Sequence, residues 1–253
     1  MVANSRFDLN NRVALITGGG SGLGQAIACG LAEAGARVAV TDVNLQGARE
    51  TAQQIQSSGG IARTACMNVT DADQIDTVID EVLTQWQKLD IVVNSAAIAI
   101  KATALDYTEA DWDTIISVNL KGVFLVSQRA ARQMVKQNRG KIINLASIGS
   151  FVAYPGSVAY LAAKGGVVQL TRSFAVELAQ HNVQVNAIAP SLFDTPQVRR
   201  VRPGSADYFI DRTPMGRMGQ PQEVIGAAIC LASDASSMVT GSTLPVDGGF
   251  LSS

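Results

Sequence analysis

The chain has 253 residues, of which 47% are hydrophobic, 16% are charged and 5% are aromatic, and its formal net charge is -1. This length is sufficient for a large core and is compatible with one α/β domain. The charge and the few aromatic residues argue against a nucleic-acid partner, and we find neither an apolar run that could span a bilayer nor a signal peptide. We therefore expect a single domain, residues 1–253, in a soluble, cytoplasmic protein.

A glycine-rich loop follows the first predicted strand. The strand covers residues 12–17, a helix is predicted at 25–35, and the loop between them reads Gly18-Gly-Gly-Ser21-Gly22-Leu23-Gly24. Glycines let a backbone approach a ligand closely, and the free N–H groups of a helix N-terminus attract phosphate. The loop is a candidate pyrophosphate site, although alone it would also be compatible with a tight turn.

The second predicted strand, residues 35–42, ends in an acid. Asp42 lies eighteen residues after Gly24, near the spacing at which a carboxylate hydrogen-bonds the ribose 2′-hydroxyl of a dinucleotide. NAD has that hydroxyl, NADP has a phosphate there, and Val43 stands where a basic residue could follow. The sequence therefore predicts NAD, with NADP less favoured; the alternative is that Asp42 is a plain strand end or helix cap.

Strands and helices keep alternating along the rest of the chain. We predict further strands at 61–67, 90–94, 141–146, 183–189 and 242–246, and helices at 45–57, 71–87, 109–136, 157–180 and 223–232. Residues 190–221 are predicted to be irregular, and long connections of this kind are often functional or mobile. The alternation predicts an α/β fold: a doubly wound parallel sheet of about seven strands with helices on both faces, a Rossmann fold.

The three cysteines, Cys29, Cys66 and Cys230, are far apart in the chain, and each lies among apolar or small residues. This pattern is typical of reduced thiols in the core rather than of disulfides or metal ligands. We expect no metal site.

The stretch from Ser147 to Lys164 places a hydroxyl, a phenol and an ammonium close together. Ser147 follows a predicted strand at the sheet edge where open α/β sheets bind ligands, and Tyr160 and Lys164, at i and i+4, share one helix face. A nearby cation lowers the pKa of a tyrosine from about 10, so this pair could transfer protons near pH 7. Taken alone, Tyr-x-x-x-Lys is also compatible with a solvated helix face.

Together these motifs resemble the short-chain dehydrogenase/reductase family over essentially the whole chain. Thr17-Gly18-x-x-x-Gly22-x-Gly24 is similar to the family's cofactor loop, Asn94-Ser-Ala96-Ala97 to its Asn-Asn-Ala-Gly element, and Asn186–Pro190 to the segment leading to the nicotinamide. The resemblance implies a catalytic tetrad of Asn119, Ser147, Tyr160 and Lys164. It also implies that the cofactor is bound by Thr17, Gly18, Ser21, Gly22, Leu23, Gly24, Asp42, Asn68, Val69, Asn94, Ala96, Tyr160, Lys164, Pro190 and Thr195.

The same resemblance implies a role for each tetrad residue. Tyr160 would be the acid or base at the substrate oxygen, and Ser147 would hydrogen-bond that oxygen. Lys164 would hold ribose hydroxyls and lower the Tyr160 pKa, while Asn119 would anchor a water in the proton relay. The chain departs from the family pattern at Ser95, at Ala97, at Asn68, where an aspartate usually contacts adenine, and at Ser191, where a glycine usually follows Pro190.

These residues predict an NAD-dependent oxidoreductase that transfers a hydride between nicotinamide and a polar secondary alcohol or ketone. Likeness to sugar and polyol members of the family favours a sugar alcohol, a sugar or a sugar acid as the small-molecule substrate. One alternative is a 3-oxoacyl-thioester reductase, which Asp42 disfavours because such enzymes usually use NADP. Another is a non-catalytic dinucleotide sensor or scaffold, which the intact tetrad disfavours.

Two further expectations concern larger segments. We expect residues 191–212 to form a mobile lid over the substrate, with Arg199, Arg200, Arg202 and Arg212 available for an anionic substrate. The alternative is that these arginines are solvated or bridge subunits. As in tetramers of the family, we expect a homotetramer with contacts through helical residues 119–136 and 157–180.

Overall fold

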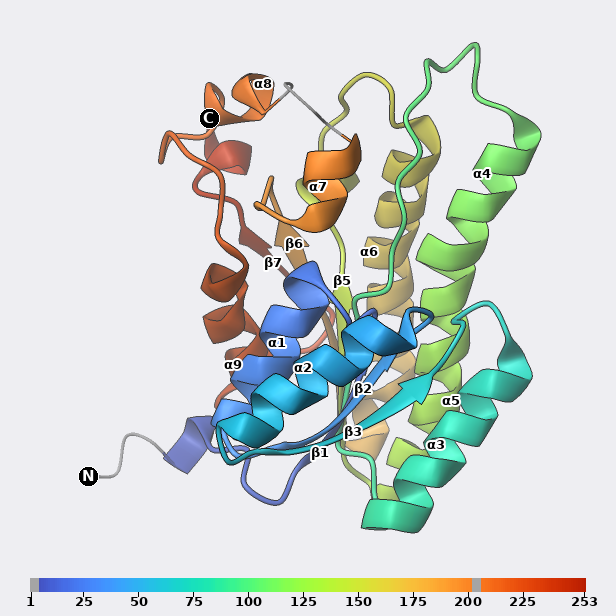
Figure 1. The fold of residues 1–253 in the computed structure, drawn as a ribbon, viewed down its shortest axis with the longest axis vertical. Coiled ribbons are helices and arrows are strands. Elements are labelled where there is room, and N and C mark those ends of the chain that lie inside the picture. Colours follow the sequence, from blue (N-terminus) through green and yellow to red (C-terminus); the bar gives the residue numbers. More distant parts are fainter. Residues whose placement is uncertain (1–4, 202–205) are drawn as a thin grey trace.

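The computed structural model describes residues 5–201 and 206–253. In this part of the chain, seven parallel strands form one sheet in the order β3-β2-β1-β4-β5-β6-β7, with helices on both faces (Figure 1). The strands are β1 (Val13–Thr17), β2 (Arg37–Asp42), β3 (Ile61–Cys66), β4 (Ile91–Asn94), β5 (Gly140–Leu145), β6 (Val183–Pro190) and β7 (Thr243–Val246). The predicted fold is confirmed, and the strand order reverses between β1 and β4, where such sheets bind ligands.

Each face of the sheet packs against its own group of helices. One group is α1 (Gly22–Glu33), α2 (Leu45–Ser57) and α9 (Ile225–Ala232); the other is α3 (Ala72–Trp86), α4 (Glu109–Ile116), α5 (Gly122–Gln137) and α6 (Val158–Leu178). The alternation of side chains along β1 connects both layers: Ala14 and Ile16 pack with the first group, and Val13 and Leu15 pack with the second. The core is therefore two apolar layers separated by the sheet.

Local sequence explains where several helices begin and end. Asp71 precedes α3, and its side chain accepts hydrogen bonds from the N–H groups of Asp73 and Gln74, as expected of a capping residue. The predicted long helix over 109–136 is present as α4 and α5 joined by a π-helical segment, Ser117–Lys121, which contains Asn119. Short π-helical segments often mark functional sites.

The prediction for the connection between β6 and α9 is wrong in part. The connection at 190–221 is not wholly irregular, because it includes two short helices, α7 (Pro196–Val201) and α8 (Asp207–Ile210). Thr195 accepts a hydrogen bond from the Val198 N–H and Pro196 occupies the first helical position, a combination that starts a helix. Arg202 lies outside the described residues.

The cysteine prediction also fails in part. Cys29 and Cys230 are half-buried, whereas Cys66 is exposed because it lies at the end of the edge strand β3. All three are free thiols. Across the described ranges, no helix combines the length and apolarity that a membrane crossing requires.

Candidate active site

A groove of about 610 Å³ runs along the carboxyl-terminal edge of the sheet. The loops after β1, β2, β3, β4, β5 and β6 all contribute to its walls. Most residues predicted to bind the cofactor lie in these walls: Gly18, Ser21, Gly22, Leu23, Gly24, Asp42, Asn68, Val69, Ala96, Tyr160, Lys164, Pro190 and Thr195. The structure thus brings together at one site residues that are far apart in the sequence.

The glycine loop leaves space that larger residues would fill. A Cβ at position 24 would overlap the carbonyl oxygen of Gly18, and Gly18 has φ +64°, a conformation that favours glycine. Helix α1 begins at Gly22, and its first turn contains no acidic residue. The open backbone and the positive helix end fit the pyrophosphate of a dinucleotide.

Asp42 lies at the end of β2, beside this loop. Its Oδ2 accepts a hydrogen bond from the Gly20 N–H at 3.0 Å, and its Oδ1 accepts one from the Asn44 N–H at 2.9 Å. The carboxylate therefore holds the loop in place and also faces the groove. Its remaining lone pairs fit the hydroxyls of a ribose.

Asn68 is partly occupied by a local turn. Its Oδ1 accepts hydrogen bonds from both the N–H group and the hydroxyl of Thr70, at 3.0 and 2.9 Å. The amide oxygen is thus already used, and what Asn68 can offer a ligand in the groove is its Nδ2 donor.

Thr17 and Asn94 do not line the groove but support it. The Thr17 Oγ1 accepts hydrogen bonds from the N–H groups of Ser95 and Ala96, both at 3.1 Å, and so joins the ends of β1 and β4. Asn94 donates to Ser127 Oγ at 2.9 Å and to Asn144 Oδ1 at 2.8 Å, within the buried interior. Both side chains position the walls rather than face a ligand.

Ser147, Tyr160 and Lys164 lie together in the groove. Ser147 follows β5, and its Oγ accepts a hydrogen bond from the Gly149 N–H at 3.0 Å. Lys164 is 3% exposed, its ammonium donates to the Leu145 carbonyl, and its Nζ lies 5.7 Å from the centre of the Tyr160 ring. Burial lowers the pKa of Lys164 to about 8, so the side chain is largely cationic at neutral pH.

Asn119, the fourth predicted catalytic residue, lies behind the groove wall. It is fully buried in the π-helical segment, and its amide makes two hydrogen bonds to the backbone of Ile98. Oδ1 accepts from the Ile98 N–H at 2.9 Å, and Nδ2 donates to the Ile98 carbonyl at 2.8 Å. In this structure Asn119 fixes the loop after β4.

A smaller cavity of about 80 Å³ opens beside the hydroxyls of Ser147 and Tyr160. Six of the residues that line it are polar, five with a hydroxyl and one with an amide, and none of the described residues that line it is charged. Sequence reasoning did not select Tyr154, Ser157 and Gln197, which belong to this lining. Their positions in the sequence could have indicated this, because Tyr154 and Ser157 lie between Ser147 and Tyr160, and Gln197 lies in the predicted lid.

The arginines of the predicted lid have different environments. Arg199 forms a bidentate ion pair with Asp194, with Nε to Oδ1 at 2.7 Å and Nη2 to Oδ2 at 2.8 Å, and these hydrogen bonds lower the pKa of Asp194. The Arg212 guanidinium stacks 3.9 Å from the centre of the Tyr208 ring. Arg200 lines the groove. Of the predicted arginines within the described ranges, it is Arg200 that faces the site.

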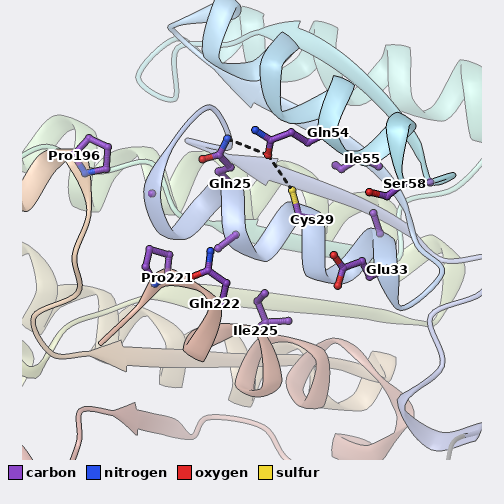
Figure 2. Close-up of a pocket in the computed structure, with 14 residues that line it drawn as sticks. Gln25, Cys29, Glu33, Gln54, Ile55, Ser58, Pro196, Pro221, Gln222 and Ile225 are labelled. Carbon is purple, nitrogen blue, oxygen red and sulfur yellow. Dashed lines mark hydrogen bonds between the residues drawn. The ribbon is translucent and has the colours of Figure 1, made fainter. Parts of the chain in front are cut away.

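A second hollow, of about 410 Å³, lies between α1, α2 and the segment leading into α9 (Figure 2). Gln25 and Cys29 both point toward Gln54, whose Oε1 is 3.5 Å from Gln25 Nε2 and 3.8 Å from Cys29 Sγ. Burial, followed by the charge of Glu33, raises the pKa of the Cys29 thiol, so this sulfur is a poor nucleophile. The hollow has none of the predicted tetrad in its described lining.

Comparisons with known proteins agree with this geometry. A family profile described as "Enoyl-(Acyl carrier protein) reductase" matches residues 18–251. The chain is 38% identical to a 3-oxoacyl-[acyl-carrier-protein] reductase of Thermotoga maritima, with 96% of this chain and 99% of that protein covered. It is 39% identical to a 2-dehydro-3-deoxy-D-gluconate 5-dehydrogenase of Dickeya dadantii, with 99% of each covered. A crystal structure of a gluconate 5-dehydrogenase from Burkholderia cenocepacia, in complex with NADP and tartrate, superposes with a TM-score of 0.95 at 41% identity and covers 99% of each chain.

Proposed function

Since the chain belongs to the short-chain dehydrogenase/reductase family, we propose that it interconverts a secondary alcohol of a sugar acid or polyol and the corresponding ketone, with NAD as the cofactor. As a member of this family it is an oxidoreductase that acts on CH–OH groups and uses a nicotinamide cofactor. The observation that supports the proposal most is the convergence of Ser147, Tyr160 and Lys164 on the groove that also contains the glycine loop and Asp42.

The groove residues would hold the cofactor at three places. The Gly18–Gly24 loop and the start of α1 would bind the pyrophosphate, Asp42 and Asn68 the adenosine half, and Pro190 and Thr195 the nicotinamide half. The bound nicotinamide supplies the hydride acceptor or donor. The protein supplies orientation, charge placement and exclusion of water.

Tyr160 would transfer the proton at the substrate oxygen. In the oxidation direction its phenolic oxygen takes the proton of the substrate hydroxyl, and the Ser147 hydroxyl stabilises the same oxygen by a hydrogen bond. The Lys164 ammonium near the Tyr160 ring favours the phenolate. Both polar atoms of the Asn119 amide already hydrogen-bond the Ile98 backbone, so this amide would hold the loop after β4 rather than a relay water.

The choice of NAD over NADP depends on Asp42. An ionised carboxylate at this position accepts hydrogen bonds from ribose hydroxyls and repels a 2′-phosphate. The Burkholderia cenocepacia structure contains NADP, so a similar protein binds the phosphorylated cofactor, and Asp42 is the residue that supports NAD for this chain. The ratio of kcat/KM with NAD to that with NADP tests this part of the proposal.

The lining of the small cavity supports a polyol or sugar-acid substrate. Hydroxyl and amide groups such as those of Tyr154, Ser157 and Gln197 suit a substrate with several hydroxyls. A 3-oxoacyl thioester, the substrate class of the Thermotoga maritima relative, is less favoured because Asp42 favours NAD. The non-catalytic alternative is excluded if any alcohol is turned over with NAD.

The test is a spectrophotometric screen of NAD reduction with polyols, aldonic acids, hydroxy acids and simple alcohols, and of NADH oxidation with 3-oxoacyl thioesters. We expect activity with a sugar acid or polyol. Activity confined to the thioesters would overturn the substrate assignment, and no activity with any of these compounds would overturn the enzymatic one.

We also propose how the molecule is organised. Residues 1–253 would act as one catalytic domain, residues 191–212 would close over the substrate, and four copies would assemble through α5 and α6. The position of Pro196, Gln197 and Arg200 on the groove supports the role of the lid.

A further inference from the structure

Ser191 lies where the small cavity and the cofactor groove meet. It follows Pro190, the last residue of β6, and lines both spaces. Its backbone N–H donates to the Val246 carbonyl at 3.2 Å, so its main chain is held by the neighbouring strand β7. The side chain is thus attached to a fixed backbone close to the Ser147 and Tyr160 hydroxyls.

The Ser191 hydroxyl has no hydrogen-bond partner among the described residues, although its Oγ is buried. A buried hydroxyl without a partner costs free energy, which a ligand recovers if it supplies the missing hydrogen bond. Since no hydrogen bond holds the Oγ, rotation about χ1 to another staggered position breaks none. The hydroxyl can therefore turn toward the cavity when a substrate enters.

We propose that Ser191 is a specificity-determining residue, whose hydroxyl hydrogen-bonds a substrate hydroxyl on a carbon next to the one that is oxidised. This inference rests on the proposed function and identifies which feature of the substrate is recognised. Ser147, Tyr160 and Ser191 line the same cavity, so a Ser191 hydroxyl turned toward it would meet a part of the substrate close to the reacting oxygen. A serine side chain supplies one donor and two lone pairs, which suits an alcohol partner.

The consequence is selectivity for substrates with adjacent hydroxyls. A site that hydrogen-bonds a substrate hydroxyl discriminates strongly against analogues without it, because the buried group on the protein is then left unpaired. A plain secondary alcohol would use Ser147 and Tyr160 but leave Ser191 without a partner. A polyol would satisfy all three hydroxyls.

The test compares the parent with Ser191→Ala on two kinds of substrate. The first is gluconate or threitol, whichever the parent oxidises faster; the second is 2-butanol, which has no second hydroxyl. We expect Ser191→Ala to lower kcat/KM for the polyol about tenfold or more and to change kcat/KM for 2-butanol less than about twofold. The dissociation constant of NADH should stay unchanged.

Thr243→Val is the matched control, because Thr243 Oγ1 is also buried without a partner but lies at the start of β7. It should leave the ratio between the two substrates unchanged. The inference would be overturned if Ser191→Ala left the ratio of kcat/KM for the polyol to that for 2-butanol unchanged, or if it weakened NADH binding. A parent that oxidises no polyol overturns the proposed function itself, and the Ser191 inference with it, so the two failures are distinguishable.

Discussion

At the scale of single residues, Lys164 has two properties that act against each other. The ammonium is almost fully buried, and it donates a hydrogen bond to a neutral group, the Leu145 carbonyl. Burial therefore lowers the pKa of Lys164 to about 8. The same burial places the charge beside the Tyr160 ring and shields the pair from water, which strengthens their interaction. Burying the Lys164 ammonium thus lowers the stability of the fold, but it also produces the contact with Tyr160 that we propose for catalysis.

Tyr160→Phe tests the proton transfer directly. The substitution keeps the ring but removes the hydroxyl that we assign as the acid or base, so kcat should fall at least about a thousandfold. NADH binding, measured by fluorescence titration, should remain within about threefold of the parent. A variant that retains substantial turnover would exclude Tyr160 as the proton-transfer residue.

Lys141, outside the site, allows a test of how a buried lysine affects stability. Burial lowers its pKa to about 8, and its Nζ donates to the Ser236 carbonyl and hydroxyl, both at 3.2 Å. The pKa of a lysine in the unfolded chain is higher, about 10.4. Between about pH 8 and pH 10.4 the unfolded state therefore binds more protons than the folded state does. The contribution of Lys141 to the free energy of unfolding should therefore rise from pH 8 to pH 10.

The measurement is urea unfolding of the parent and of Lys141→Met at pH 7, 8, 9 and 10. Relative to the variant, the parent should gain about 1–2 kcal/mol over this range, allowing for screening by water. Lys101→Met serves as the control for the loss of a surface lysine, since Lys101 is exposed and no ion pair holds it among the described residues, and it should give no such gain. A parent-minus-variant difference that is flat with pH would show that Lys141 is not desolvated.

At the scale of elements, the strands could be predicted because buried parallel strands are apolar runs with polar or glycine-rich ends. The predicted strands at 90–94 and 183–189 differ from β4 and β6 by one residue. The short helices α7 and α8 could not be predicted in the same way, because a helix of four to six residues has no period to detect. Phe209 of α8 packs with Ile148, Leu192 and Phe250, contacts that only the folded chain provides.

The candidate site was predictable to the extent that each group lies at the end of a recognisable element. Tyr160 and Lys164 share a helix face at i and i+4, and Asp42 ends a strand. The spacing of these residues in the sequence was therefore enough to predict where they lie relative to the sheet. The small cavity combines side chains from loops that are remote in sequence, such as Ile100, Tyr154 and Gln197. Their proximity depends on tertiary packing, which no local pattern encodes.

Asp42, at the end of β2, should determine cofactor choice. Asp42→Ala removes the charge that repels a 2′-phosphate and the hydrogen bonds to ribose, so kcat/KM with NAD should fall at least tenfold relative to that with NADP. Because Asp42 also accepts hydrogen bonds from Gly20 and Asn44, the loop itself could shift in this variant. Asp42→Asn keeps an acceptor and separates the effect of charge from that of loop geometry. A parent that prefers NADP would contradict the assignment.

Within the proposed lid, Arg199 and Arg200 are adjacent in sequence but should differ in function. Arg199 is bound by Asp194, whereas Arg200 lines the groove three residues after Gln197, on the same face of α7. For a sugar-acid substrate, Arg200→Ala should raise KM about fivefold, which corresponds to the loss of one exposed ion pair. The KM for a neutral polyol should stay unchanged. Arg199→Ala is the matched control and should change neither. Equal effects on acid and polyol, or a weakened affinity for NADH, would assign Arg200 to the cofactor instead.

At the scale of the whole molecule, the outer surfaces of α5 and α6 carry apolar side chains that the described chain does not cover. Val176 is 80% exposed and Val158 is 37% exposed, and they lie eighteen residues apart on α6, which is five full turns and therefore the same face. Phe124 of α5 is 36% exposed and packs edge-on against Phe174 of α6. Exposed apolar side chains aligned along one face of a helix, as Val158 and Val176 are on α6, are typical of a subunit interface.

We therefore expect a tetramer that depends on this face, and Val176→Glu should disrupt it. A buried, unpaired carboxylate at the centre of an apolar contact costs several kcal/mol for each subunit pair, so light scattering at micromolar concentration should show a mass reduced to that of dimers or monomers. Ile61→Glu is the control: Ile61 is 53% exposed on the edge strand β3, away from α5 and α6, and its substitution should leave the mass unchanged. Circular dichroism of both variants should match the parent, which separates loss of assembly from loss of fold. A parent that is monomeric would show that both helices pack only on their own sheet, and the apolar face would then need a different explanation.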